Sequence, residues 1–333
     1  MALTFSQNSG LNDDFWKPVG QVLKSVMKDT DTEKTQYDKL VSDVANVETS
    51  KKYAEKAAGI TSTGSYGIVD EGDAPKQDEI QETFPKLIVH KQFMQQISCT
   101  QQMKEDGDIN VMKTMSRNLV LGYKRTRAEL VTNAIATEGK KFSIGGRELD
   151  RTTGDGEALF STAHKGVKAG VEDQSNVFTN AFGTDATMLG RLANIGRNFK
   201  NDSGIVQGYT FDTIIIPGNC YALEDLIKRI IRSDLIVGSS NNDANTQKGL
   251  WNLIVLPTWQ AAEGKNPYII MSSAANKELR GTVLFDRTKL DVRNWVDNST
   301  RNLIWNGRAR MSCGFNNWRH VIMGGADVGT TLS

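Results

Sequence analysis

Asp155, Ser161 and His164 carry the three side chains that a serine hydrolase needs, and they lie within ten positions of one another. In such a triad the histidine accepts the serine proton while the carboxylate orients the imidazole ring. No Gly-x-Ser-x-Gly elbow surrounds Ser161, and three residues on one short loop rarely converge in that geometry. We therefore predict that the chain has no catalytic residue.

Candidates for metal chemistry are three histidines and three cysteines: His90, His164, His320, Cys99, Cys220 and Cys313. They show neither the His-x3-His nor the Cys-x2-Cys spacing of a metal site, and the cysteines lie about a hundred residues apart. The glycine-rich segment 64–72 lacks the Gly-Lys-Ser/Thr ending and following helix that hold a phosphate. We expect no metal and no cofactor, and we expect the cysteines to be buried as small apolar residues.

The composition is that of a folded protein, and the net charge is too small to create a strong overall electrostatic field. The chain has 333 residues, of which 38% are hydrophobic and 24% are charged. Forty basic and thirty-nine acidic residues leave a formal charge of +1, which does not favour nucleic acid or an anionic membrane as the main partner. No run of eighteen apolar residues and no basic-then-apolar start is present, so we expect a protein made and kept in a cytoplasm.

One long element must organise the chain, because apolar residues recur at helical spacing from Asp108 to Gly139 without a proline. These residues are Met112, Met115, Leu119, Tyr123, Leu130 and Ala134. Asp108 is a suitable N-cap and Gly139 a suitable stop. About thirty residues rising 1.5 Å each predict a spine helix of roughly 45 Å.

The segments before this helix are polar. Residues 1–57 contain scattered apolar side chains, and we predict an arm with one or two short helices that need another surface to pack on, or else a mobile terminus. From residue 87 to 99 the pattern alternates as in a strand. Leu87, Val89, Phe93, Ile97 and Cys99 share one predicted face, and Ile88, His90 and Gln92 share the other.

This strand predicts an extended hairpin with an acidic tip between residues 70 and 82, where Gly72 and Pro75 favour a turn. The tip carries Asp70, Glu71, Asp73, Asp78, Glu79 and Glu82, against Lys76. A lone hairpin is marginal in water, so we predict that it docks on a neighbouring subunit; the alternative is an ordinary solvated loop. The predicted basic receptor is on the spine helix: Lys113, Arg117, Lys124, Arg125 and Arg127.

The second half of the chain predicts an α/β layer and a long closing strand. Short strands are predicted at 213–217, 250–256, 268–271 and 282–285, and a helix at 221–233. The closing strand spans 303–315, about 43 Å at 3.3 Å per residue, which suits packing along the spine helix. Its predicted core face holds Leu303, Trp305, Ala309, Met311, Cys313 and Phe315, and its other face holds Ile304, Asn306, Arg308, Arg310 and Ser312.

The segment 155–164 also reads Asp-Gly-x-Ala-Leu-Phe-Ser-x-x-His, which resembles the major head (capsid) protein of Mu-like and related tailed phages. The matching positions are Asp155, Gly156, Ala158, Leu159, Phe160, Ser161 and His164. The segments 173–176, 211–218 and 317–319 follow in the same order, so the resemblance covers nearly the whole chain.

The resemblance implies an α+β fold of the Hong Kong 97 capsid type. It implies an N-terminal arm at 1–57, an E-loop hairpin at 58–108 and a P-domain with the spine helix at 109–200. An A-domain at 201–280 and a return through the A-domain edge to the closing P-domain strands at 281–333 complete the expected order. The arm is too short for the large fused scaffolding region of some relatives.

The implied function is that of a major capsid protein which self-assembles as pentamers and hexamers into an icosahedral shell. The shell would enclose the double-stranded DNA of a tailed phage or prophage, and it would be assembled in the bacterial cytoplasm and end in the virion. Expected partners are further copies of the chain, a portal, a separate scaffolding protein and non-specifically packaged DNA, with no membrane. The alternatives are an encapsulin-type nanocompartment shell and a soluble α/β enzyme.

Overall fold

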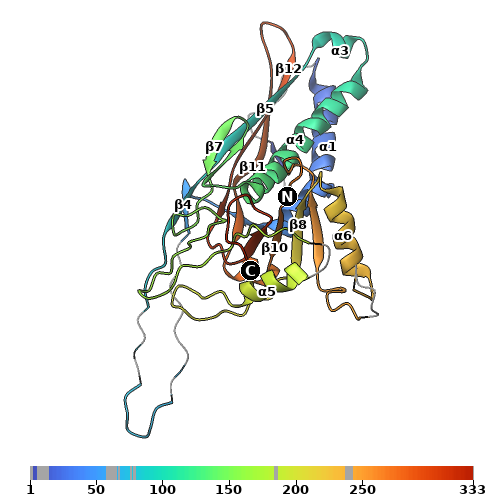
Figure 1. Ribbon diagram of the computed structural model, residues 1–333. Coiled ribbons are helices and arrows are strands. Elements are labelled where there is room, and N and C mark those ends of the chain that lie inside the picture. The colour runs from blue at the N-terminus through green and yellow to red at the C-terminus, as the bar shows by residue number, and fades with distance from the viewer. Residues whose placement is uncertain are drawn as a thin grey trace. The chain divides into compact units, whose positions relative to one another are not determined.

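The computed structural model describes residues 3–5, 15–57, 66, 68–75, 77, 80–183, 187–236 and 243–332. Figure 1 labels most of its helices and strands. In chain order they are β1 (Thr4–Phe5), α1 (Lys17–Thr32), α2 (Gln36–Val44), β2 (Asn46–Thr49), β3 (Ala54–Ala57), β4 (Lys86–Val89), β5 (Lys91–Cys99), α3 (Gln101–Glu105), α4 (Ile109–Ala136), β6 (Lys141–Ile144), β7 (Arg147–Asp150), α5 (Thr187–Arg197), β8 (Thr213–Pro217), α6 (Tyr221–Arg232), β9 (Asn252–Leu256), β10 (Tyr268–Met271), α7 (Ser273–Glu278), β11 (Thr282–Val296), β12 (Leu303–Phe315) and β13 (Val321–Gly324). The predicted α+β class is therefore confirmed.

The chain divides into two compact units, each built from separate stretches of sequence. Unit 1 contains Met1–Glu55, Ile88–Val131 and Leu284–Cys313. Unit 2 contains Lys56–Leu87, Thr132–Val283 and Gly314–Ser333. No helix in the described ranges is both long and apolar enough to cross a bilayer.

The sheet of unit 1 has the strand order β1-β11-β12-β5, and β2 also pairs with β11. β12 runs antiparallel to β5, with Leu303 opposite Cys99 and Met311 opposite Lys91. β12 has the predicted bounds 303–315, and its predicted core face is buried while Ile304, Asn306, Arg308 and Arg310 remain half-buried. The closing-strand prediction is therefore confirmed.

The spine helix α4 begins one residue after the predicted cap and ends three residues before the predicted stop. The Met112 amide donates to the Asp108 carbonyl at 3.2 Å, and Gly139 has φ +88°, which suits a residue without a side chain. A Cβ placed on Gly307 of β12 would lie 3.5 Å from Leu119 Cδ1 of α4. The bare glycine therefore lets the helix lie close to the strand, and the predicted packing of the spine on the closing strand is confirmed.

The N-terminal segment forms two helices, as predicted, and both contact other stretches of unit 1. Val19, Leu23 and Met27 lie on one stripe of α1 and are buried, and Trp16 is 1% exposed, with its indole N–H donating to the Arg301 carbonyl at 3.2 Å. All of these side chains lie in unit 1. The helical spacing gathers the few apolar residues into one stripe, and the helices pack on later segments of the same chain, in agreement with the predicted need for another surface.

The predicted strand at 87–99 is interrupted at His90, between β4 and β5. Leu87 is 60% exposed, whereas Ile88 and His90 are 6% and 4% exposed. Beyond the break the odd-numbered residues Phe93, Ile97 and Cys99 point to the more buried face, as predicted. One extra residue at the break inverts the alternation, so the predicted face for Leu87 is wrong.

Unit 2 contains a four-stranded sheet in the order β13-β10-β8-β9, in which β8 and β9 are parallel. All five residues of β8 are buried, and α6 buries Leu223, Ile227 and Ile230. The strands at 213–217 and 268–271 have their predicted bounds. The predicted strand 282–285 continues to Val296, and α5 and α7 were not predicted.

Candidate functional site

The acidic hairpin belongs to unit 2 and opens from the two-stranded pair β3 and β4. Its tip contains the predicted turn, since the Asp73 amide donates to the Asp70 carbonyl at 3.1 Å and Gly72 has φ +95°. Asp70, Glu71, Asp73 and Glu82 are exposed, and Glu82 pairs with Lys56 at 2.7 Å. Asp78 and Glu79 lie outside the described residues.

Apolar side chains accompany the acids on this hairpin. Tyr66 and Ile68 are fully exposed, Ile80 is 55% exposed and Val69 is 44% exposed. A soluble chain rarely leaves several large apolar side chains of one segment in water unless another surface covers them. The described part of the hairpin therefore has the composition of a contact surface.

Two of the predicted spine cations are not available on the surface. Arg127 is 1% exposed and its Nη2 lies 2.8 Å from Asp286 Oδ2. Lys124 is 2% exposed and its Nζ lies 3.0 Å from Asp38 Oδ2. Both carboxylates belong to unit 1 itself, so the assignment of Lys124 and Arg127 to an exposed basic surface is wrong.

The pKa values of the two carboxylates in these ion pairs shift in opposite directions. Burial raises the pKa of Asp286, and Arg127 opposes that rise without cancelling it. Burial also acts on Asp38, but the hydrogen bonds from Lys124 and Thr35 outweigh it and lower the pKa of Asp38. Arg127 is therefore the main group that limits the rise in the pKa of this deeply buried carboxyl.

The other predicted spine cations remain accessible. Arg117 is exposed and pairs with Glu33 at 3.2 Å. Arg125 is exposed and its guanidinium carbon lies 5.9 Å from the centre of the Tyr37 ring. Lys113 is half-buried. Their role in contacts between subunits stays a prediction.

The Asp155–His164 segment folds into a cross-braced loop in unit 2. His164 Nδ1 lies 2.7 Å from Asp155 Oδ2, and His164 Nε2 lies 3.2 Å from Asn176 Oδ1. The imidazole stacks on Trp318 with ring centres 4.3 Å apart and planes 7° apart. Burial opposes ionisation of Asp155, but the hydrogen bonds from His164 and Thr153 lower the pKa of Asp155 overall. Two of the three residues do converge, which sequence reasoning did not predict.

The third residue, Ser161, takes a structural place in the same loop. Its amide donates to Asn176 Oδ1 at 3.0 Å and its Oγ accepts from the Ala163 amide at 3.3 Å. Both ring nitrogens of His164 already face the oxygens of Asp155 and Asn176, so the histidine has no nitrogen left to activate the serine. The motif braces the loop instead of forming a triad.

A second braced histidine lies at the interruption between β4 and β5 in unit 1. His90 Nδ1 lies 2.9 Å from Ser312 Oγ and His90 Nε2 lies 2.9 Å from Ser50 Oγ. Burial lowers the pKa of His90, Arg310 and Arg287 lower it further, and Glu55 opposes them.

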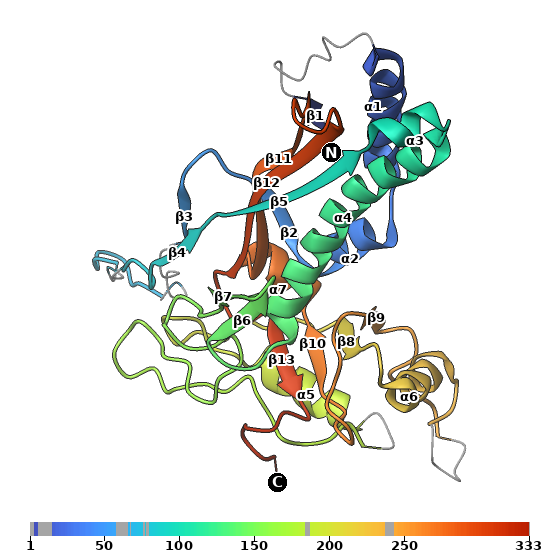
Figure 2. The same ribbon diagram turned by 90° about the horizontal axis from the view of Figure 1, so that it is seen from above.

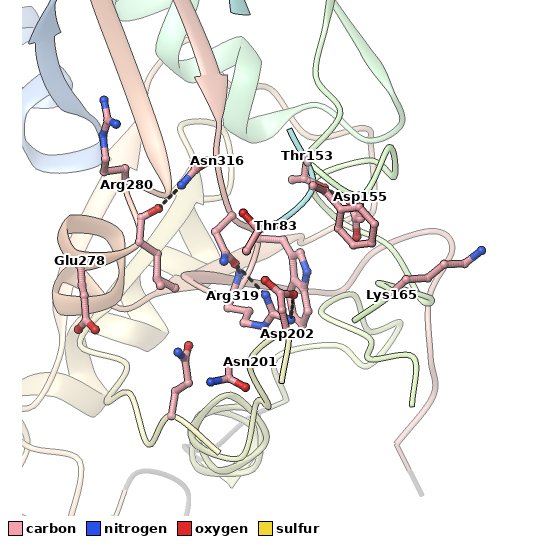
Figure 3. A pocket seen from close by; sticks show the side chains of 16 residues that line it. Thr83, Thr153, Asp155, Lys165, Asn201, Asp202, Glu278, Arg280, Asn316 and Arg319 are labelled. Carbon is pink, nitrogen blue, oxygen red and sulfur yellow. Dashed lines mark hydrogen bonds and ion pairs between the residues drawn. The ribbon is translucent and has the colours of Figure 1, made fainter. Parts of the chain in front are cut away.

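A cavity of about 400 Å³ in unit 2 is a candidate for a ligand site (Figure 3). Its lining contains one internal ion pair: Arg319, which is 2% exposed, lies 3.0 Å from Asp202 Oδ1 and donates to the Lys200 carbonyl at 2.7 Å. Asn316 donates to the Leu279 carbonyl at 2.9 Å, as Figure 3 shows. The lining has no arrangement of nucleophile, base and oxyanion donor.

Within the described ranges, no group of three or more His, Cys, Asp and Glu side chains is placed to hold a metal ion. Cys99, Cys220 and Cys313 form no disulfide and are buried, as predicted. Burial raises the pKa of the Cys99 thiol to about 11, so it stays protonated and unreactive.

No protein-family model matches the sequence, and a search of curated proteins found no relative. Solved structures do share the fold. A chain of Mycobacterium phage Patience superposes with a TM-score of 0.53 at 11% identity, covering 97% of this chain and 90% of that one. The capsid of the native GTA particle gives 0.55 at 9% identity (88% and 91%), and Mycobacterium phage Adephagia gives 0.52 at 12% identity (87% and 90%). The predicted resemblance to phage capsid proteins is confirmed at the level of the fold.

Proposed function

We propose that this chain is the major capsid protein of a tailed phage or prophage, with a structural and not a catalytic role. The observation that carries this proposal is the shared fold with a particle capsid over 88% of this chain and 91% of the other. Copies would assemble as pentamers and hexamers into an icosahedral shell around double-stranded DNA. The shell would belong to the virion and form in the bacterial cytoplasm.

The elements fit the parts of a Hong Kong 97-type subunit. In this proposal β3, β4 and the acidic hairpin form the E-loop, and α4 with β11 and β12 forms the P-domain. The sheet β13-β10-β8-β9 with α6 forms the A-domain. The N-terminal arm would include α1 and α2, which are also packed within unit 1.

The hairpin is the part of the chain that most needs a neighbour. A two-stranded sheet is marginal alone in water, and Tyr66 and Ile68 are fully exposed. In a closed symmetric shell each subunit covers the hairpin of the next, so every such surface is buried in turn. We propose that Asp70, Glu71, Asp73 and Glu82, together with Asp78 and Glu79, meet cations of an adjacent copy.

Partners other than the chain itself follow from this role. A portal and a separate scaffolding protein would join the shell. Packaged DNA would be held without sequence preference. A formal charge of +1 suits a shell that does not pin DNA by releasing counterions at many phosphates.

Electron microscopy of the expressed and purified full chain tests the proposal. We expect closed particles of uniform size, and only small soluble species would favour an enzyme. Particles from the native source should contain nuclease-protected double-stranded DNA. A protein cargo without DNA would favour an encapsulin-type compartment and contradict the phage role.

A further inference from the structure

The second strand of the hairpin rests on a loop of its own unit where it returns from the tip. We call residues 80–87 the hairpin base and residues 150–155 the platform, and both belong to unit 2. Lys86 of β4 contacts Asp150 Oδ2 and Thr152 Oγ1, and its side chain is 12% exposed. A Cβ on Gly154 would lie 2.8 Å from the Phe84 carbonyl oxygen. The hairpin base and the platform therefore touch through a side chain and through their backbones.

The contact at Lys86 is a closed group of three polar side chains. The Thr152 hydroxyl donates to Asp150 Oδ1 at 2.9 Å, and the Thr152 amide donates to the same oxygen at 3.0 Å. Burial opposes ionisation of Asp150, but the hydrogen bonds from Lys86 and Thr152 lower the pKa of Asp150 overall. Hydrogen bonds to charged groups are stronger than those between neutral groups. We call Lys86, Asp150 and Thr152 the latch.

One end of the platform is fixed to the spine helix. Arg151, between the two platform residues of the latch, is fully buried and donates to the carbonyls of Ala134, Ile135 and Gly139. Its amide donates to the Lys140 carbonyl at 2.9 Å. Figure 2 shows β7, which ends at the latch, beside β4 and near the end of α4. The latch therefore connects the hairpin base to the C-terminal end of α4.

The other end of the platform is held by the braced histidine. The Thr153 hydroxyl donates to Asp155 Oδ1, and the Thr153 amide donates to the Glu157 carbonyl at 2.8 Å. Asp155 Oδ2 lies 2.7 Å from His164 Nδ1. Thr153 is 1% exposed. The Asp155–His164 motif, which forms no catalytic triad, thus keeps the platform in place under the hairpin base.

The cavity of about 400 Å³ borders both parts (Figure 3). Its lining includes Thr83 and Phe84 of the hairpin base and Thr153, Gly154 and Asp155 of the platform. A cavity of this size and polarity has room for several water molecules. Phe84 is 36% exposed, so burial alone holds it weakly. The hairpin base therefore has space to shift when the latch is broken.

We propose that Lys86 is a positioning residue, which holds the hairpin base on the platform and sets the direction of the hairpin before a neighbouring copy binds. This inference rests on the proposed capsid function, but the contacts that carry it lie within one subunit. A segment already held in its binding direction loses less conformational entropy on association. The latch therefore speeds the addition of subunits to a growing shell. Because the Asp150 side chain is 57% exposed, the latch adds little to the stability of the whole chain.

Hydrogen exchange of the unassembled full chain, read by mass spectrometry, tests the latch directly. Lys86→Met removes the ammonium group and keeps an apolar side chain of similar length. Its matched control is Lys141→Met, which removes the same charge from an exposed ion pair with Glu148 at 2.8 Å. Gly154→Ala presses a methyl group against the Phe84 carbonyl, whereas Gly190→Ala on α5 places one where no atom lies within 4 Å.

We expect amide exchange in residues 80–87 to rise about tenfold or more in Lys86→Met and in Gly154→Ala, because local opening then breaks fewer contacts. The two controls should exchange like the wild type. Unchanged exchange in both test variants would overturn the latch.

A charge exchange keeps the inference testable if Gly154→Ala fails to fold. Lys86→Glu should loosen the hairpin base, and Lys86→Glu combined with Asp150→Lys should restore slow exchange. Lys86→Arg should also keep it, since a guanidinium reaches the same carboxylate. A double variant as loose as Lys86→Glu alone would overturn the assignment of this ion pair.

The rate of particle formation, followed by light scattering, tests the role in assembly. Lys86→Met should lower the initial rate about fivefold or more, because the free hairpin must be ordered as it binds. Its melting temperature should match that of Lys141→Met. A normal rate in a chain with a loosened base would overturn the positioning role. Failure of the wild-type chain to form any particle would contradict the proposed function, and the exchange measurements would still decide whether the latch exists.

Discussion

Replacing Arg151 should destabilise unit 2 by removing the group that completes the end of α4. The side chain is fully buried and its guanidinium donates to the Ala134 carbonyl, to the Ile135 carbonyl at 3.2 Å and to the Gly139 carbonyl at 2.9 Å. The last carbonyls of a helix have no partner within the helix, and a cation there also opposes the negative end of its dipole. Arg151 therefore supplies three hydrogen bonds and one charge to the same helix end.

The magnitude follows from what Arg151→Met leaves behind. Gly139 is exposed, so water replaces its lost donor, but Ala134 and Ile135 lie in the buried last turn. At roughly 1.5 kcal/mol for each buried acceptor left unsatisfied, the loss is about 3 kcal/mol. Burial lowers the pKa of Arg151 to about 9, and Glu138 opposes this shift. Because a buried charge is itself unfavourable, its removal offsets part of the lost stability, and we do not expect a loss larger than about 3 kcal/mol.

Urea unfolding of the full chain followed by tryptophan fluorescence, with a thermal scan, measures the effect. A loss of about 3 kcal/mol should lower the melting temperature by roughly 6 to 12 °C. Arg151→Lys keeps the charge and should lose less, since an ammonium still reaches some of the carbonyls. Arg147→Met, an exposed arginine on β7, should change stability by less than about 0.5 kcal/mol. If Arg151→Met lost less than about 1 kcal/mol, the assignment of Arg151 as the helix cap would be refuted.

Three further outcomes are expected. Arg127→Met should cost about 3 to 5 kcal/mol in urea unfolding, because Asp286 is left buried without its cation; a change as small as that of Lys39→Met would contradict this. The pKa of His90 in the folded chain is below its ordinary value of 6.5, so the contribution of His90 to stability should be complete above pH 6.5 and be lost as the pH falls below 6.5. His90→Gln should flatten this dependence of stability on pH, and an unchanged pH profile in the variant would contradict the assignment. Replacing residues 68–75 by a glycine-serine linker should leave the melting temperature unchanged yet abolish closed particles in electron micrographs, and shells of normal size would show that the tip is dispensable.

The bounds of strands whose apolar residues are spaced by burial were predicted closely. β8 and β10 lie wholly inside unit 2, and β12 alternates because one of its faces packs on α4, so apolar spacing alone gives their bounds. β11 was predicted to end at Phe285, because residues 286–296 are rich in charge. Four of its five charged residues, Arg287, Lys289, Asp291 and Arg293, alternate with Asp286 and lie on the opposite side of the strand, where a strand keeps its backbone pairing without apolar side chains.

The contacts of the candidate site were harder to predict from the sequence, because they join residues that are far apart along the chain. Lys124 and Arg127 read as exposed helix charges, and only folding brings Asp38 and Asp286 against them. The spacing of Asp155 and His164 could be seen in the sequence. Asn176, which contacts the second ring nitrogen of His164, and Trp318, which stacks on the imidazole ring, come from other segments and could not be predicted. The acidic tip was predictable, since it depends on local composition alone.

The interleaving of unit 1 along the chain affects how the protein is made. β5 pairs with β12, and Cys99 finds its partner Leu303 about 200 residues later. At a translation rate of about 5 to 20 residues per second, a nascent β5 waits roughly 10 to 40 seconds on the ribosome before its sheet can close. During that interval the sheet of unit 1 lacks β11 and β12, which span 15 and 13 residues. A chain still being synthesised therefore cannot complete the sheet of unit 1 until nearly its whole length has been made.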